Sequence, residues 1–187
     1  RSMLRQAPDI IMVGEIRDVE TAQIAIQSAL TGHLIFSTLH TNDSVSAVTR
    51  LIDMGIKPYL VSATVQGVMA QRLVRTICPS CREAYKPSEE ERSMLNIKQE
   101  EAENFELYRG KGCPSCNNTG FKGRIGIYEL FMLNSDLKEM ILNEVPNPEL
   151  LQKAKECGLR TLKEDGLEKV KMGHTTIQEV LRVTQDI

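Results

Sequence analysis

Several features are scarce or missing in this sequence, and each absence excludes a class of protein. Tryptophan is absent and aromatic residues make up 4% of the 187 residues, so stacking surfaces for single-stranded nucleic acid are not expected. Apolar runs such as Ile10–Val13 fall far short of the roughly 18–20 residues that a membrane-spanning helix needs. The net charge is −2, from 23 basic and 25 acidic residues, which argues against direct nucleic-acid binding through a basic surface.

Two sequence patterns are missing as well. No G-x-x-x-x-G-K-[ST] loop, which would cradle phosphates, occurs in the chain, and Gly110-Lys111-Gly112 has the wrong spacing for one. The chain opens at Arg1-Ser2-Met3-Leu4 without the pattern of a signal peptide. We therefore expect a fragment of a longer protein from a reducing compartment.

The composition that remains, 41% hydrophobic and 26% charged, is ordinary for a globular protein, and the pattern divides the chain into three zones. Residues 1–77 predict strands buried on both faces at Ile10–Val13 and Leu34–Leu39. Helices are expected at Val19–Leu30, from Asn42 or Asp43 to near Gly55, and over 59–71, with a short strand over 72–77. Strands that alternate with helices indicate an α/β fold with a parallel sheet.

The other two zones differ from the first in composition and sequence pattern. In residues 78–128, cysteine blocks flank acidic stretches at 89–91 and 100–106, which indicates a small metal-binding subdomain. Residues 129–187 predict a helical subdomain. Its helices are expected to begin at four residues with capping side chains: Ser135, Asn147, Thr161 and Thr176. Thr161 with Glu164 and Thr176 with Glu179 both match the capping box.

Cysteine spacing is the most specific signal in the sequence. Two Cys-Pro-Ser-Cys blocks supply Cys78 with Cys81 and Cys113 with Cys116. Four thiolates suit tetrahedral Zn²⁺ and leave no open position for water, so we predict a structural zinc site. Two disulfides, four free thiols or an iron–sulfur cluster are the alternatives. Cys157 has no partner in this pattern and is expected to be a core thiol.

Two strand ends carry candidate catalytic residues. Glu15 follows the apolar run Ile10–Val13, as the carboxylate of a Walker B strand does, where it can hold Mg²⁺ through water or orient an attacking water. The alternative is a carboxylate that only starts a helix. His33 and His40 bracket the second strand, and Thr38 lies at its exit. These polar groups could sense a phosphate, whereas a lone histidine is more often structural.

Three ordered stretches resemble the type II secretion and type IV pilus assembly ATPases, and the resemblance as a whole covers essentially the whole chain. Leu4–Asp18 resembles their Walker B region, and Ala29–Asp43 resembles their "His box". Ala70–Cys78, followed by the second cysteine pair, resembles the zinc-bearing insertion of the secretion and pilus-extension branch.

The resemblance implies a fold, an activity and a set of partners. The fold would be the distal part of a RecA-like P-loop NTPase core (1–77), a tetracysteine zinc subdomain (78–128) and a C-terminal helical subdomain (129–187). The full-length protein would be a homo-hexameric ATP hydrolase that uses Mg²⁺ and drives pilin or pseudopilin assembly. It would act through an inner-membrane platform protein, in the cytoplasm at the inner face of the bacterial inner membrane. Its membrane association would be peripheral and through partners, without direct nucleic-acid binding.

The resemblance also implies roles for individual residues. Glu15 would be the Walker B carboxylate, with His33 and His40 near the γ-phosphate. Arg17 and Thr38 would contribute to nucleotide binding. The Walker A loop would lie upstream, so the fragment alone is expected to be inactive. The competing hypotheses are a non-catalytic zinc-ribbon interaction module and a purely structural role. The sequence does not distinguish pilus assembly from type II secretion or DNA uptake.

Overall fold

The computed structural model describes residues 8–98 and 105–184, which form two compact units. One unit combines the chain up to Ala70 with Leu130–Leu159, and the other combines Gln71–Glu129 with the segment from Arg160 onward. Both units are built from segments that are distant in sequence, whereas the zones 1–77, 78–128 and 129–187 follow the chain. The three-zone division therefore stays a prediction. Leu4–Ala7 and the acidic residues of 100–104 lie outside the described residues.

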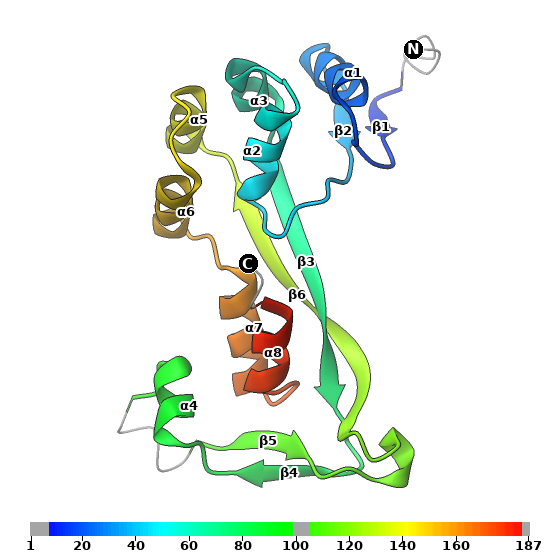
Figure 1. Ribbon diagram of the computed structural model, residues 1–187, viewed down its shortest axis with the longest axis vertical. Helices are drawn as coiled ribbons and strands as arrows, with labels where there is room; N and C mark the ends of the chain where they lie inside the picture. The colour runs from blue at the N-terminus through cyan, green and yellow to red at the C-terminus, as the bar shows by residue number, and fades with distance from the viewer. Residues whose placement is uncertain (1–7, 99–104, 185–187) are drawn as a thin grey trace. The chain divides into compact units, whose positions relative to one another are not determined.

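The first unit contains both strands and helices, so the predicted α/β class is confirmed. Its elements in chain order are β1 (Ile10–Met12), α1 (Val19–Leu30), β2 (Leu34–Phe36), α2 (Ser46–Asp53), α3 (Pro58–Thr64), α5 (Ser135–Leu142) and α6 (Asn147–Glu156) (Figure 1). Among the described residues, no helix is long and apolar enough to cross a membrane.

Helix α1 has the bounds predicted from the sequence, and local chemistry explains both ends. The Asp18 carboxylate accepts a hydrogen bond from the backbone N–H of Thr21 at 2.8 Å, which satisfies a donor in the first turn. Gly32 follows the last turn with φ +95°, a left-handed conformation that glycine adopts without strain. Ala22 and Ile26 are buried, as the periodicity predicts.

Strands β1 and β2 pair in parallel, with Ile10 opposite Leu34 and Met12 opposite Phe36. The prediction that both strands are buried on both faces is wrong. Ile11 is buried, but Ile10, Met12 and Phe36 are 60%, 75% and 55% exposed. Alternate side chains of a strand point to opposite faces, and within the described residues only one face of this two-stranded sheet is covered.

The segment between α2 and the next strand departs from the prediction. Helix α2 begins at Ser46, later than predicted, and Val45 rather than Asn42 or Asp43 is its N-cap residue. Asp43 accepts a hydrogen bond from the N–H of Ser46 at 2.7 Å in the turn that precedes the helix. Helix α3 ends at Thr64, and β3 (Gly67–Ile77) takes up residues 67–71, which were predicted to be helical. The apolar residues of 67–71 fit both the spacing of a helix and that of a strand. They form a strand because β3 pairs with β6 (Phe121–Met132).

The core of the first unit lies among its helices and the end of β6. Buried members are drawn from every helix and from Phe131 and Leu133: Ala22, Ala25, Ile26, Val48, Leu51, Val61, Leu137, Ile141, Leu150 and Ala154. Helix α5 is capped by Asn134 rather than Ser135, since the Asn134 side chain accepts from the N–H of Leu137 at 3.0 Å. Helix α6 begins at Asn147, but Pro146 rather than Asn147 is its N-cap residue.

The second unit is built on the greater part of the β3–β6 pair. Its other elements are β4 (Arg82–Tyr85), α4 (Glu89–Met94), β5 (Leu107–Gly110), the short 3-10 helix η2 (Pro114–Cys116), α7 (Leu162–Lys171) and α8 (Ile177–Thr184) (Figure 1). Side chains from the helices bond to the outer edges of the two long strands. The N–H of Arg75 on β3 donates to Glu179 at 3.0 Å, and the N–H of Tyr128 on β6 donates to Asp165 at 2.9 Å.

Two capping boxes were predicted for α7 and α8, and one is complete. The Thr161 hydroxyl accepts from the N–H of Glu164, whose carboxylate accepts from the N–H of Thr161 in return. At α8 the Thr176 hydroxyl accepts from the N–H of Glu179 at 3.3 Å, but the Glu179 carboxylate bonds to Arg75 and Arg182. The Glu179 side chain, predicted to cap the start of α8, therefore binds two guanidinium groups instead.

Gly166 lies within α7, where glycine is unfavourable for a helix, and a close helix approach explains it. A Cβ atom there would lie 2.6 Å from Cγ1 of Val180 on α8. We expect Gly166→Ala to lower stability by about 1–2 kcal/mol, although alanine is the better helix former. Thermal unfolding checks this. In a Val180→Ala background the same change is expected to become stabilising, and a loss of equal size there would contradict the packing explanation.

Candidate functional site

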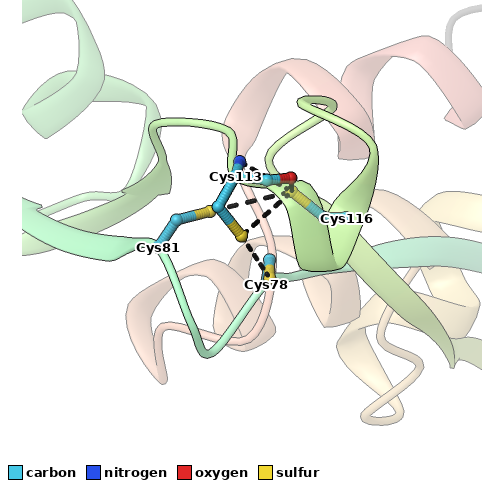
Figure 2. Close-up of side chains that lie close together, drawn as sticks. All are labelled: Cys78, Cys81, Cys113 and Cys116. Carbon is cyan, nitrogen blue, oxygen red and sulfur yellow. Dashed lines mark hydrogen bonds between the residues drawn. The ribbon is translucent and has the colours of Figure 1, made fainter.

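The four cysteines of the two Cys-Pro-Ser-Cys blocks meet at one point of the second unit, as Figure 2 shows. Antiparallel pairing of β4 with β5 brings them there, with Arg82 opposite Gly110. Cys81 directly precedes β4, and Cys113 follows β5 by three residues. Of the 31 residues between Cys81 and Cys113, those that the structure describes include β4, α4 and β5, in line with the separate excursion that this long spacing predicts.

Distances between the sulfurs fit a single tetrahedral metal ion. All four Sγ atoms lie within 4.8 Å of one another, with separations of 3.9 Å for Cys78–Cys113 and 3.7 Å for Cys113–Cys116. A tetrahedron of Zn–S bonds of about 2.3 Å places its sulfurs about 3.8 Å apart. Disulfides would need sulfurs about 2.0 Å apart. A four-iron cluster would place iron and sulfide between its cysteines and hold them farther apart.

Backbone groups support negative charge on one of these sulfurs, that of Cys116. Burial would raise the pKa of the Cys116 thiol, but the N–H groups of Cys113 and Gly120 donate to its sulfur, and the net pKa is lowered to about 6. Burial raises the pKa of the Cys81 thiol, so a thiolate there needs the charge of a bound cation. The Cys113 N–H lies 3.3 Å from Cys116 Sγ. Metal binding requires thiolates, so these donors prepare the site for a cation.

Glycines at the cysteine loops are a part of the site that the sequence analysis missed. Gly110-Lys111-Gly112 was considered only as a failed phosphate loop. In the structure, a Cβ atom on Gly112 would lie 2.8 Å from the carbonyl oxygen of Asn118, and one on Gly120 would lie 2.5 Å from that of Gly110. Close approach of the two loops therefore requires these glycines. Their position beside the cysteine blocks was the available signal.

A second group of candidate residues lies beyond the ends of β1 and β2. Backbone bonds continue past the strands, from Val13 N–H to Phe36 and from Ile16 N–H to Thr38. The Thr38 hydroxyl also donates to the carbonyl oxygen of Gly14 at 2.7 Å. These bonds hold the segment with Glu15 beside the segment that follows β2. Ligands of α/β proteins bind at this end of a parallel sheet.

The Glu15 carboxylate faces two basic side chains there. Its Oε2 lies 2.5 Å from a guanidinium nitrogen of Arg17, and its Oε1 lies 2.6 Å from Nε2 of His40. Arg17 holds the pKa of the Glu15 carboxyl below its ordinary value, while burial opposes this and His40 adds to it. Oε1 is buried and faces His40 Nε2 at ion-pair distance, without a further hydrogen-bond donor among the described residues. The carboxylate therefore lies between two basic side chains, one from its own segment and one from the segment after β2.

His33 does not join this group. It precedes β2, whereas His40 follows the strand, so the two histidines lie beyond opposite ends of it. Its Nδ1 lies 3.0 Å from the carbonyl oxygen of Ser28 and 3.1 Å from the Thr31 hydroxyl, at the end of α1. Its predicted place near the γ-phosphate therefore stays a prediction. His33 closes the turn between α1 and β2.

Cys157 was expected to be a core thiol, and this prediction is wrong, because the residue is exposed.

Comparison with known proteins places the chain among secretion proteins. The family model described as type II/IV secretion system protein matches residues 1–182. The type II secretion system ATPase E of Vibrio cholerae is 50% identical over 186 residues, covering 100% of this chain and 36% of that protein. The type IV pilus assembly ATPase PilB of Thermus thermophilus is 47% identical over 184 residues, covering 98% of this chain and 21% of that protein.

Solved structures show the same fold. The pilus retraction motor PilT with bound ADP matches with a TM-score of 0.66 at 24% identity, covering 97% of this chain and 41% of that one. The ATPase DotB of Legionella pneumophila matches with a TM-score of 0.65 at 20% identity, covering 100% of this chain and 41% of that one. The chain thus spans about a third or less of the curated relatives named above. With its sequence matched almost from end to end, the chain belongs to the family of type II/IV secretion system proteins.

Proposed function

We propose that this chain is the C-terminal part of an ATP-hydrolysing motor that drives pilin or pseudopilin assembly. The observation that carries the proposal is Glu15, whose carboxylate lies beyond the end of a parallel strand and faces Arg17 and His40. Relatives named as ATPases of type II secretion and type IV pilus assembly support it. Type II secretion and type IV pilus assembly would both use this hydrolysis of ATP.

In the proposed reaction, ATP binds with Mg²⁺ at the ends of β1 and β2. Glu15 accepts a hydrogen bond from the water that attacks the γ-phosphate, or from a water on Mg²⁺. The Thr38 hydroxyl holds the two strand-end segments together through Gly14, and His40 contacts Glu15 from the second segment. The four cysteines hold a structural Zn²⁺ and take no part in hydrolysis, because a four-thiolate ion has no open position.

The proposal extends to assembly and place of action. The full-length protein would act as a homo-hexamer in the cytoplasm, at the inner face of the bacterial inner membrane, and would be held there by an inner-membrane platform protein. ATP hydrolysis would change the orientation of its domains, and the ring would pass that movement to the platform protein. The resemblance of the Walker B, His-box and cysteine motifs supports this extension.

ATP turnover by the full-length protein tests the role of Glu15. Glu15→Gln keeps the size of the side chain and removes its charge, and we expect turnover to fall by at least about 100-fold. Glu20→Gln is the matched control, because Glu20 is an exposed carboxylate in the first turn of α1, outside the site. Its turnover is expected to equal that of the wild type. Metal content and folding are recorded for every variant.

Three outcomes separate the hypotheses. An inactive, folded Glu15→Gln variant beside an active wild type supports the motor. Equal activity of the two would make Glu15 a structural carboxylate. An inactive wild type that carries zinc would favour the non-catalytic zinc-ribbon module.

The chain by itself is expected to show no ATP turnover. Its 187 residues contain no G-x-x-x-x-G-K-[ST] loop, and the lysine and backbone N–H groups of that loop bind the β- and γ-phosphates. Phosphate release by the purified chain, compared with its Glu15→Gln variant, is the measurement. Turnover that the substitution abolishes would contradict the expectation, whereas turnover that it leaves unchanged would come from a contaminant.

A further inference from the structure

The contact between Arg17 and Glu15 restrains the carboxylate that the proposed function depends on. The guanidinium nitrogen lies 2.5 Å from Glu15 Oε2, so the two groups are in direct ionic contact. The two residues are separated by Ile16 alone, which is buried in the core of the first unit. Anchoring of Ile16 keeps the Arg17 and Glu15 side chains beside each other on the opposite side of the segment.

This pairing weakens the carboxylate as an acceptor. A guanidinium group that donates to a carboxylate withdraws negative charge from it, so the carboxylate binds and polarises a water less strongly. The lowered pKa of Glu15 has the same cause. Glu15 is therefore a weaker base with Arg17 in place than without it.

Arg17 is free to leave this position. Its side chain is 75% exposed, whereas that of Glu15 is 20% exposed. Within residues 8–98 and 105–184, Glu15 is the one ionic partner of Arg17. Exposed ion pairs of this kind contribute about 0–1 kcal/mol, because water competes for both charges. An anion that binds the guanidinium more strongly can therefore replace Glu15 as the partner of Arg17.

We propose that Arg17 is a latch that a bound nucleotide opens. In the nucleotide-free protein the guanidinium neutralises Glu15, and on binding it exchanges the carboxylate for a phosphate oxygen. Guanidinium groups bind carboxylates and phosphates with the same geometry, so the exchange needs only a rotation of the exposed side chain. Glu15 then recovers its full charge while the γ-phosphate is present. This inference rests on the proposed function and adds a means by which the site suppresses base catalysis when it is empty.

A double-mutant cycle on nucleotide affinity tests the latch. The probe is a non-hydrolysable ATP analogue with Mg²⁺, and the protein is the full-length form as wild type, Glu15→Gln, Arg17→Ala and the double variant. If the latch exists, Glu15→Gln frees Arg17 before the nucleotide arrives. We expect its dissociation constant to fall about three- to fivefold, which corresponds to the energy of an exposed ion pair.

The Arg17→Ala background separates the latch from simple charge repulsion. With no guanidinium to release, Glu15→Gln is expected to change affinity by less than about 1.5-fold there. Repulsion between Glu15 and the phosphates predicts the opposite, since loss of Arg17 exposes the phosphates to the full carboxylate charge. Arg17→Lys keeps the cation and is expected to restore part of the coupling.

Each result decides the matter. An effect of Glu15→Gln that is equal or larger in the Arg17→Ala background overturns the latch, and so does a wild type that binds no nucleotide. Turnover of the same preparations keeps the two proposals apart. A motor without a latch loses turnover in Glu15→Gln yet shows additive affinities, whereas a failed motor shows no turnover in the wild type.

Discussion

Removing the metal from the four-cysteine site is expected to unfold the cysteine loops and the β4–β5 ribbon, while the first unit keeps its helices. Strands β4 and β5 have four residues each, and a two-stranded ribbon of this size is marginally stable on its own. Structural Zn²⁺ contributes roughly 10 kcal/mol to small domains that depend on it. That is more than the ribbon can replace from its own contacts.

Hydrogen exchange measured region by region, with and without a zinc chelator, checks this expectation. Protection of Arg82–Tyr85 and Leu107–Gly110 is expected to disappear, and protection of α1 and α5 is expected to remain. Cys113→Ser should reproduce the loss, because it removes one of the four sulfurs. Cys157→Ser is the matched control, since Cys157 is exposed and lies outside the cluster. Unchanged protection in metal-free protein would contradict the expectation that the metal stabilises the cysteine loops and the β4–β5 ribbon.

Replacing Glu179 with alanine is expected to destabilise the second unit by about 1–3 kcal/mol, because the backbone N–H of Arg75 loses its acceptor and the two arginines lose their shared anion. The carboxylate side chain is 1% exposed, with Arg75 at 2.7 Å and Arg182 at 2.7 Å. It also accepts the backbone N–H of Arg75. Loss of this side chain leaves two arginines beside each other without their shared anion.

Acid is expected to have a related effect. Burial alone would raise the pKa of Glu179, but hydrogen bonds from Arg182 and Arg75 lower it to about 2. A carboxyl whose pKa is lowered by folding stabilises the protein above its ordinary pKa. That stability is lost as the pH falls from about 4.5 towards 2. The free energy of unfolding, measured between pH 5 and 2, is therefore expected to decline less steeply in Glu179→Gln than in the wild type.

Glu168→Ala serves as the matched control for both measurements. Glu168 also pairs with a basic residue three positions away, Lys171, but its side chain is 40% exposed. Its removal is expected to change stability by less than about 0.5 kcal/mol, because water screens exposed pairs. A loss at Glu179 no larger than the loss at Glu168 would refute the buried ion pair as a main source of stability.

Local patterns predicted the features that depend on neighbouring residues. Helix α1 has the predicted bounds, because its apolar spacing and Gly32 are local signals. The Thr161 capping box formed, since both of its partners belong to the helix start. The cysteine cluster was also predictable, because two Cys-x-x-Cys blocks supply the ligands of one metal whatever the chain does between them.

Features that distant residues decide could not be predicted. Residues 67–71 form a strand because β6, more than 50 positions later, pairs with them. Glu179 left its expected capping role because Arg75, 104 positions away, offers a charged partner. His33 and His40 have similar polar surroundings in the sequence, and only the structure shows that His40 alone reaches Glu15.

The two carboxylates that bond to the outer edges of β3 and β6 also bear on solubility. An edge strand with unsatisfied N–H groups is a template on which another chain can add a strand, and such additions lead to aggregates. Glu179 and Asp165 occupy the N–H groups of Arg75 and Tyr128, and the carbonyl oxygen of His174 occupies that of Ile77. These three bonds leave fewer N–H groups on the β3–β6 ribbon to which a strand of another chain could add.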